Sequence, residues 1–305
     1  MLSRGDKMRK NLFFLETTDV RDGLFPSLRH ALAQLKTMND ENGGKYRNSA
    51  RVIKKIKSTF KVKPEELYDA LINLTYPRCE IDLVDGHGIL GFPPANMHFT
   101  EMRVSNFYRQ IISNYNTTDY NKPLYLPLPL ILSNGTVSSK NHKTFIPSHN
   151  IGEVIDATIA LIQNPDIETK DLLKYIKGPD IIVGGEITNS EQLPSIYEKG
   201  RGVIEIKITP QTISDEFYGN VSEFCKWYNM KLRKYSSKKE QKILIKYKAK
   251  LFDGKTVKYM SLKEILQNYI EHCKTIETGI SDDILCQKLE KVKTIAIKRK
   301  TKVYN

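Results

Sequence analysis

Residues 149–162 read HNIGEVIDATIALI, and this stretch says most about the architecture of the chain. Asn150 and Glu153 have the spacing of a capping box, in which Asn150 caps a new helix and Glu153 reaches back to the free N–H. Four apolar residues that follow fall on one side of such a helix: Val154, Ile155, Ile159 and Ile162. Because segment 123–150 before it is rich in Pro, Ser and Asn, we predict a domain boundary there.

Upstream, residues 22–78 have the spacing of helices, and Pro64 stands where a first helical turn accepts proline. Segment 81–92, IDLVDGHGILGF, is expected to form two short strands joined by a turn, and a helix is expected from Thr100 to Ser113. The order helix, helix, hairpin is that of a winged helix. A basic run lies between the helices: Lys54, Lys55, Lys57, Lys61 and Lys63.

Downstream, the patterns predict a mixed α and β region. We expect a helix over about 168–177, strands at 203–208 and 243–252, and a helix opened by a second capping box at 261–264. The fold class is therefore α+β, and the predicted domains are 1–125, 126–258 and 259–305.

The net charge of +13 is concentrated near the C-terminal end of the sequence. From residue 226 onward there are 21 Lys and Arg against 8 Asp and Glu, which equals the whole excess. Such a region would attract a polyanion, of which nucleic acid is the commonest. A lysine-rich solvated surface is the alternative, and composition alone favours neither.

The sequence also lacks the signatures of a zinc site, a disulfide framework, a membrane span and a secretory signal. Four widely spaced cysteines without a CxxC pair argue against a zinc site or a disulfide framework: Cys79, Cys225, Cys273 and Cys286. No stretch has the length of a membrane span, and the first residues lack a secretory signal, so we expect a cytoplasmic protein with no membrane partner.

Five segments resemble one family in the same order along the chain. They are DVRDGL at 19–24, HNIGEVID at 149–156, IKGPD at 176–180, GRG at 200–202 and LKEIL at 262–266. Together they resemble the A subunit of type IIA DNA topoisomerases, the gyrase A and topoisomerase IV A family. The resemblance implies a winged-helix DNA-binding domain at 1–125, a shortened tower domain at 126–258, and the start of a C-gate helix with a basic tail at 259–305. The C-gate and the DNA-wrapping domain are expected to be absent.

The resemblance fails at the family's catalytic Arg-Tyr pair. In this chain the corresponding stretch, 95–101, reads ANMHFTE, with His98 and Phe99 in place of that pair. Phe99 has no hydroxyl to attack phosphorus, and His98 lacks the five-donor, permanently charged fork of arginine. We therefore predict that no catalytic residue is intact.

The resemblance and the basic run together suggest residues that face DNA. These are Arg21, Arg29, Lys54, Lys55, Lys61, Lys63, Arg103 and Ile146. Ile146 matches an isoleucine that wedges between base steps, although a core isoleucine is the alternative. No metal ligands are expected, because magnesium and ATP would come only through a B-type partner protein.

Two main hypotheses follow for function. The first is a DNA-binding homologue of the breakage-reunion core that does not cleave DNA, associated with the nucleoid and acting as a homodimer or heterodimer. The second is an A-type subunit of an ATP-dependent type II topoisomerase, working with a B-type ATPase or an active partner protomer. A third is a competitor that pairs with another A-type protein and blocks its gate.

Overall fold

The structure is a computed structural model that describes most of the chain. The described residues are 19–24, 26–58, 62–75, 79, 81–90, 95–112, 126, 128–135, 146–180, 186–208, 231–237, 240–248, 251–252, 257–277 and 279–303. At Pro26, between 206 and 258, and from 298 to 303, it describes the backbone alone. The predicted DNA-facing Lys61 lies outside the described residues.

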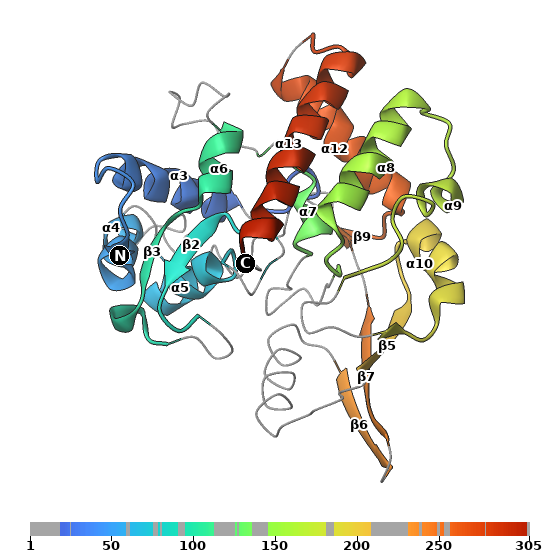
Figure 1. The fold of residues 1–305 in the computed structure, drawn as a ribbon, viewed down its shortest axis with the longest axis horizontal. Coiled ribbons are helices and arrows are strands. Elements are labelled where there is room, and N and C mark those ends of the chain that lie inside the picture. Colours follow the sequence, from blue (N-terminus) through green and yellow to red (C-terminus); the bar gives the residue numbers. More distant parts are fainter. Residues whose placement is uncertain are drawn as a thin grey trace, which may run out of the picture.

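The N-terminal part packs helices around a small antiparallel sheet, at the left of Figure 1. Its strands run in the order β1-β3-β2, and the 3₁₀ turn η2 immediately precedes β3. The bounds are α3 (Pro26–Asp40), β1 (Arg47–Asn48), α4 (Ser49–Lys57), α5 (Pro64–Ile72), β2 (Val84–His87), η2 (Met97–Phe99), β3 (Glu101–Val104) and α6 (Asn106–Ile112).

The predicted hairpin within 81–92 is wrong: in the described residues 81–90 only β2 forms, and it pairs with a strand outside this segment. Its partner is β3, in which buried Met102 and Val104 alternate with more exposed neighbours, a period of two rather than the helical 3.6. The helix expected from Thr100 therefore begins six residues later, where Ser105 Oγ accepts the main-chain N–H of Tyr108 at 2.9 Å. Proline at the start of α5 is confirmed.

The second part, at the right of Figure 1, places helices beside a four-stranded antiparallel sheet of order β4-β5-β7-β6. The predicted strand at 203–208 is β5, and it pairs with β7. The bounds are α7 (Leu130–Ser133), α8 (Ile151–Gln163), α9 (Thr169–Leu172), β4 (Glu186–Ile187), η3 (Ser190–Gln192), α10 (Leu193–Lys199), β5 (Val203–Ile208), β6 (Lys231–Ser237), β7 (Glu240–Lys248), β8 (Leu251–Phe252) and β9 (Val257–Lys258).

Two expectations about the helix ends need correction. Asn150 caps α8 as predicted, but the Glu153 carboxylate accepts the N–H of Lys177 at 3.0 Å, which ties α8 to the loop after α9. The helix expected over 168–177 is only the four-residue α9. The second capping box is confirmed: the Ser261 hydroxyl accepts the main-chain N–H of Glu264, and the Glu264 carboxylate accepts the main-chain N–H of Ser261.

The C-terminal residues form a helical hairpin rather than a helix followed by a tail. Helix α12 (Leu262–Ile276) is followed by α13 (Asp282–Val303), which packs against α8 and α6 (Figure 1). An ion pair of 2.5 Å joins Lys293 on α13 to Asp156 on α8. The basic segment 298–302 is thus the last part of a helix. In the part of the chain described, no helix combines the length and apolarity needed to cross a bilayer. The fold is α+β, while the three domain boundaries stay a prediction.

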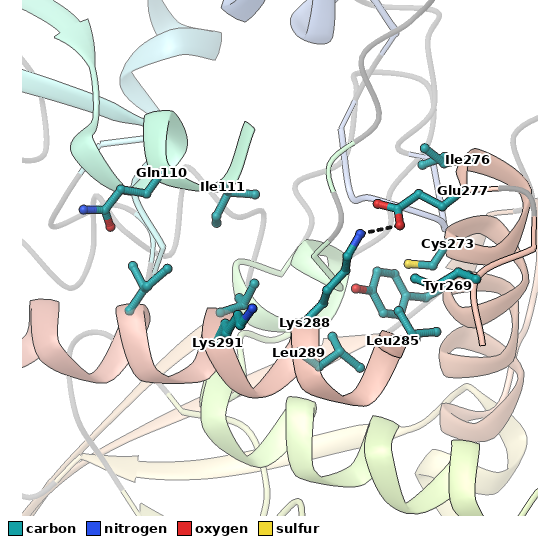
Figure 2. Close-up of a pocket in the computed structure, with 13 residues that line it drawn as sticks. Gln110, Ile111, Tyr269, Cys273, Ile276, Glu277, Leu285, Lys288, Leu289 and Lys291 are labelled. Carbon is teal, nitrogen blue, oxygen red and sulfur yellow. Dashed lines mark hydrogen bonds and ion pairs between the residues drawn. The ribbon is translucent and has the colours of Figure 1, made fainter. Parts of the chain in front are cut away.

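An apolar cavity of about 270 Å³ lies between α6, α12 and α13 (Figure 2). Lys288 and Glu277 form an ion pair at its edge, so these charges satisfy each other. Burial raises the pKa of Cys273, which lines the cavity, to about 11. The thiol is therefore protonated at neutral pH and is a packing group rather than a nucleophile.

A buried charge cluster fastens the loop at 19–24 to α3. The Arg29 guanidinium, with a side chain only 1% exposed, contacts Asp22 at 2.5 Å and Asp19 at 3.1 Å. Burial raises the pKa of Asp22 above its usual value, and Arg29 opposes that rise. Gly23, which follows Asp22, has φ 75°, and a side chain there would meet the main-chain N of Ile131 at 2.5 Å. The backbone geometry thus requires glycine at position 23, and the ion pair with Arg29 requires aspartate at position 22.

We expect the substitution Arg29→Met to destabilise the fold by about 3–5 kcal/mol, because it leaves a buried carboxylate unpaired. Chemical denaturation measures this, and adding Asp22→Asn should recover part of the loss. Arg21→Met is the matched control, since Arg21 pairs with Asp19 but its side chain is 40% exposed; we expect a change below about 1 kcal/mol. Equal losses in both single variants would contradict the buried-pair account.

Buried histidines give the fold a pH dependence. His149 Nδ1 lies 3.1 Å from the Leu132 carbonyl and Nε2 lies 2.6 Å from the Tyr197 hydroxyl, so the neutral ring donates to the first and accepts from the second. Burial lowers the pKa of His149, and also that of His272, to about 4. In the folded protein each of these two imidazole rings is neutral at pH 7.

The free energy of unfolding should therefore fall as the pH is lowered from about 6.5 to about 4. In that range the unfolded chain binds more protons than the native one, and each such histidine contributes up to about 1.4 kcal/mol per pH unit. Urea denaturation at pH 7, 5.5 and 4.5 tests this. The His149→Phe variant should be less stable at pH 7, but its free energy of unfolding should change less with pH. If the free energy of unfolding falls equally steeply with pH in the variant and the native protein, the role given to His149 is contradicted.

Candidate nucleic-acid interface

Segment 95–100, which contains His98 and Phe99, the positions predicted to replace the family's catalytic pair, forms a tight surface turn before β3. The side-chain oxygen of Asn96 accepts the N–H of His98 at 3.0 Å, and the main-chain carbonyl of Asn96 accepts the N–H of Phe99 at 2.9 Å. These bonds close the 3₁₀ turn η2. Both His98 and Phe99 are exposed, and Phe99 is 82% exposed. The turn therefore presents an aromatic ring without a nucleophile.

A buried network of hydroxyl groups holds this turn from beneath. The Tyr68 hydroxyl on α5 lies 2.9 Å from the Ala95 carbonyl and 2.9 Å from Thr100 Oγ1. Thr100 in turn contacts Ser49 Oγ at 2.9 Å, and its carbonyl accepts the N–H of Ser49 at 2.9 Å. Both ends of the turn are thus fixed to α4 and α5. Sequence reasoning did not find this network, because its members are far apart in the chain.

Helix α4 packs against η2 and carries several exposed cations. The Asn48 amide, which precedes α4, donates to the His98 carbonyl at 2.9 Å. The exposed residues of α4 include Arg51, Lys54, Lys55 and Lys57. Lys55 pairs with Glu41 at 3.3 Å, but both side chains are more than half exposed, so water screens that pair. Arg51 was missed in the sequence, although it lies three residues before Lys54 on the same helix.

Lys63 and Arg103 differ in how available they are. Lys63, at the start of α5, is 75% exposed and lies 3.6 Å from Glu66. Arg103 is 25% exposed, pairs with Asp85 at 3.1 Å, and lies 4.2 Å from the centre of the Tyr46 ring. Arg103 therefore holds β3 to its neighbours, whereas Lys63 is free to turn towards solvent.

The remaining predicted DNA contacts are mostly used inside the fold. Arg29 is buried against two carboxylates, so we remove it from the DNA-facing set. Burial would raise the pKa of Asp19, but hydrogen bonds from Arg21 and the charge of Arg29 hold it below its usual value. Ile146 is 4% exposed and belongs to the core cluster of α8 and α10, which favours the alternative of a core isoleucine. It would have to leave that core to reach a base step.

Two tyrosines of the N-terminal part, Tyr68 and Tyr108, are engaged within the fold. Tyr108 is 1% exposed, and burial raises its pKa, so it is not an available nucleophile. The Tyr68 hydroxyl is engaged beneath the turn, and Tyr76 lies outside the described residues. Within the described ranges, no group of three or more His, Cys, Asp or Glu side chains is placed to hold a metal ion.

The family model for the A subunit of DNA gyrase and topoisomerase IV matches residues 17–224. The chain belongs to this family. The A subunit of DNA gyrase from Chlamydia pneumoniae is 33% identical over 214 residues, covering 62% of this chain and 25% of that protein. The A subunit of DNA topoisomerase 4 from Staphylococcus epidermidis is 32% identical over 209 residues, with 62% and 26% covered.

This gyrase and topoisomerase IV A family member thus spans about a quarter of the length of these relatives. The corresponding protein of Neisseria gonorrhoeae, the A subunit of its topoisomerase 4, is 34% identical over 214 residues, with 62% of this chain and 27% of that one covered. The matched range contains the turn at 95–100 and helix α8. The resemblance of segment 262–266 lies beyond it and stays a prediction.

Removing the Tyr68 hydroxyl tests the anchoring network. We expect Tyr68→Phe to lower the free energy of unfolding by about 1–2 kcal/mol, because the Ala95 carbonyl loses its buried donor. Denaturation measures the loss, and amide hydrogen exchange at Phe99 should become faster. Tyr175→Phe, at a 40% exposed position, is the matched control and should change stability by less than about 0.5 kcal/mol. Unchanged exchange at Phe99 would argue against the network.

Proposed function

We propose that this chain binds duplex DNA through the surface formed by η2 and α4, and that it does not cleave DNA. The observation that carries the proposal is the exposed Phe99 beside exposed cations, at the position where family members carry a tyrosine. A phenyl ring cannot form a phosphotyrosyl bond, and the imidazole of His98 does not reproduce an arginine fork. The surrounding lysines still supply phosphate contacts that need no chemistry.

The proposal includes the architecture and partners that the family suggests. The helices and sheet of the N-terminal part would serve as a winged helix, and the sheet β4-β5-β7-β6 as a shortened tower. We propose a homodimer, or a heterodimer with a topoisomerase subunit, working on the nucleoid in the cytoplasm. Magnesium and ATP would enter only with a B-type partner.

Family membership favours one alternative. In it the chain is an A-type subunit of an ATP-dependent type II topoisomerase, and an active partner protomer or a B-type subunit completes the cleavage site. The two functions differ in one observable, the covalent protein–DNA adduct. DNA retention alone does not separate them.

Plasmid cleavage with magnesium, trapped by detergent, distinguishes the two functions. The native chain should retard DNA and give no covalent adduct, both alone and with ATP and a gyrase B subunit. Phe99→Tyr, which restores a phenol at the same exposed position, is the informative companion variant, and an active gyrase is the positive control. Adducts from the native chain would exclude the non-cleaving role and point to another nucleophile.

Salt dependence tests the binding surface. Affinity should fall steeply with ionic strength, and removal of one phosphate contact should reduce the slope of log K against log salt by about 0.9. We expect this for Arg51→Ala and for Lys54→Ala. Lys170→Ala is the matched control, because Lys170 is 70% exposed but lies on α9, on the opposite side of the molecule in Figure 1. Equal effects of all three changes would mean that binding is spread over the whole surface.

A further inference from the structure

The two most exposed large apolar side chains of the described residues lie on adjoining segments of this surface. Phe99 is 82% exposed and Ile89 is 71% exposed. Their segments touch: the N–H of Ala95 donates to the Ile89 carbonyl at 2.8 Å, and a side chain at Gly88 would meet the Phe99 carbonyl at 3.1 Å. A paired apolar projection of this kind marks a contact surface.

The ring is presented on a fixed support. The turn that carries it is bonded to Asn48 on one side and, through Ala95 and Thr100, to the buried Tyr68 hydroxyl on the other. Because the main chain is already ordered, contact through the ring costs little conformational entropy. Three elements, β1, α4 and α5, thus hold the turn in place through Asn48, Ser49 and Tyr68.

The charge around the ring indicates the chemistry of the partner. Arg51 and Lys54 are exposed on α4, which packs against η2; His98 lies in the turn itself, and His87 ends β2. The nearby carboxylate of Glu101 lies 3.5 Å from the His87 ring nitrogen. A flat apolar group within a cationic surface matches a partner that combines flat apolar faces with anionic links, and nucleic acid has both.

We propose that Phe99 inserts its ring against a base step of bound duplex DNA, with Ile89 beside it. Apolar wedges of this kind unstack a step and kink the duplex, and the cost is lowest where stacking is already weak. The position therefore serves as a stacking contact that selects flexible or mismatched steps. This inference rests on the proposed DNA-binding function.

Affinity for two duplexes of the same length tests it, one fully paired and one with a central mismatch. The native chain should prefer the mismatched duplex. Phe99→Ala should weaken binding to that duplex by about ten-fold or more and leave the salt slope unchanged, because a stacking contact is lost and no phosphate contact. Phe99→Trp should retain the preference. Tyr175→Ala, at a 40% exposed position beyond α9, is the matched control and should behave as native.

Each outcome decides the question. If Phe99→Ala keeps both the affinity and the mismatch preference while the native chain still retards DNA, base insertion is overturned and DNA binding stands. If the native chain binds neither duplex, the proposed function fails and the inference with it. If the variant changes only self-association in sedimentation velocity, the apolar pair is a contact between copies of the chain, and the inference is overturned.

Discussion

The buried pairing of Arg29 with Asp22 is the constraint on which the N-terminal part depends. A guanidinium and a carboxylate removed from water are tolerated only with close partners, so the loop at 19–24 and the start of α3 must keep one geometry. Asp22 also faces the N–H of Leu126 at 3.5 Å, and Gly23 lies against the main chain of α7. One ionic contact therefore positions three separate stretches of chain. The surface turn at 95–100 is built on the side of this framework, through α4 and α5.

The support of the turn at 95–100 does not depend on the two side chains that it exposes. Tyr68, Thr100 and Ser49 form hydrogen bonds that fix the main chain beneath Phe99, and none of these groups needs the family's catalytic pair. The identity of the side chain at position 99 matters little to the fold, because the Phe99 ring is 82% exposed. The residues that hold the turn and the residues that it presents to solvent are thus different ones.

Sequence patterns predicted the parts of the fold that depend on local rules. The caps at Asn150 and Ser261, proline at the start of α5 and the strand at 203–208 are all confirmed, since each follows from neighbouring residues. Strand β3 was missed because Met102 and Val104 carry too short an alternation to outweigh the helical pattern after them. The DNA-facing set was only partly informative: a resemblance gives Arg29 and Ile146 as equivalents, but whether a side chain points inward depends on contacts that are distant in sequence.

Helix α13 has a mechanical consequence. It lies against α6 on one side and α8 on the other, and Lys293 ties it to Asp156. Any opening of the molecule between these two helices would have to peel α13 from one of them and expose the apolar residues that it shares with both, including Leu285, Leu289 and Ala296. The hairpin of α12 and α13 therefore acts as a brace. In this conformation, α13 therefore links the N-terminal part to the second part through α6 and α8.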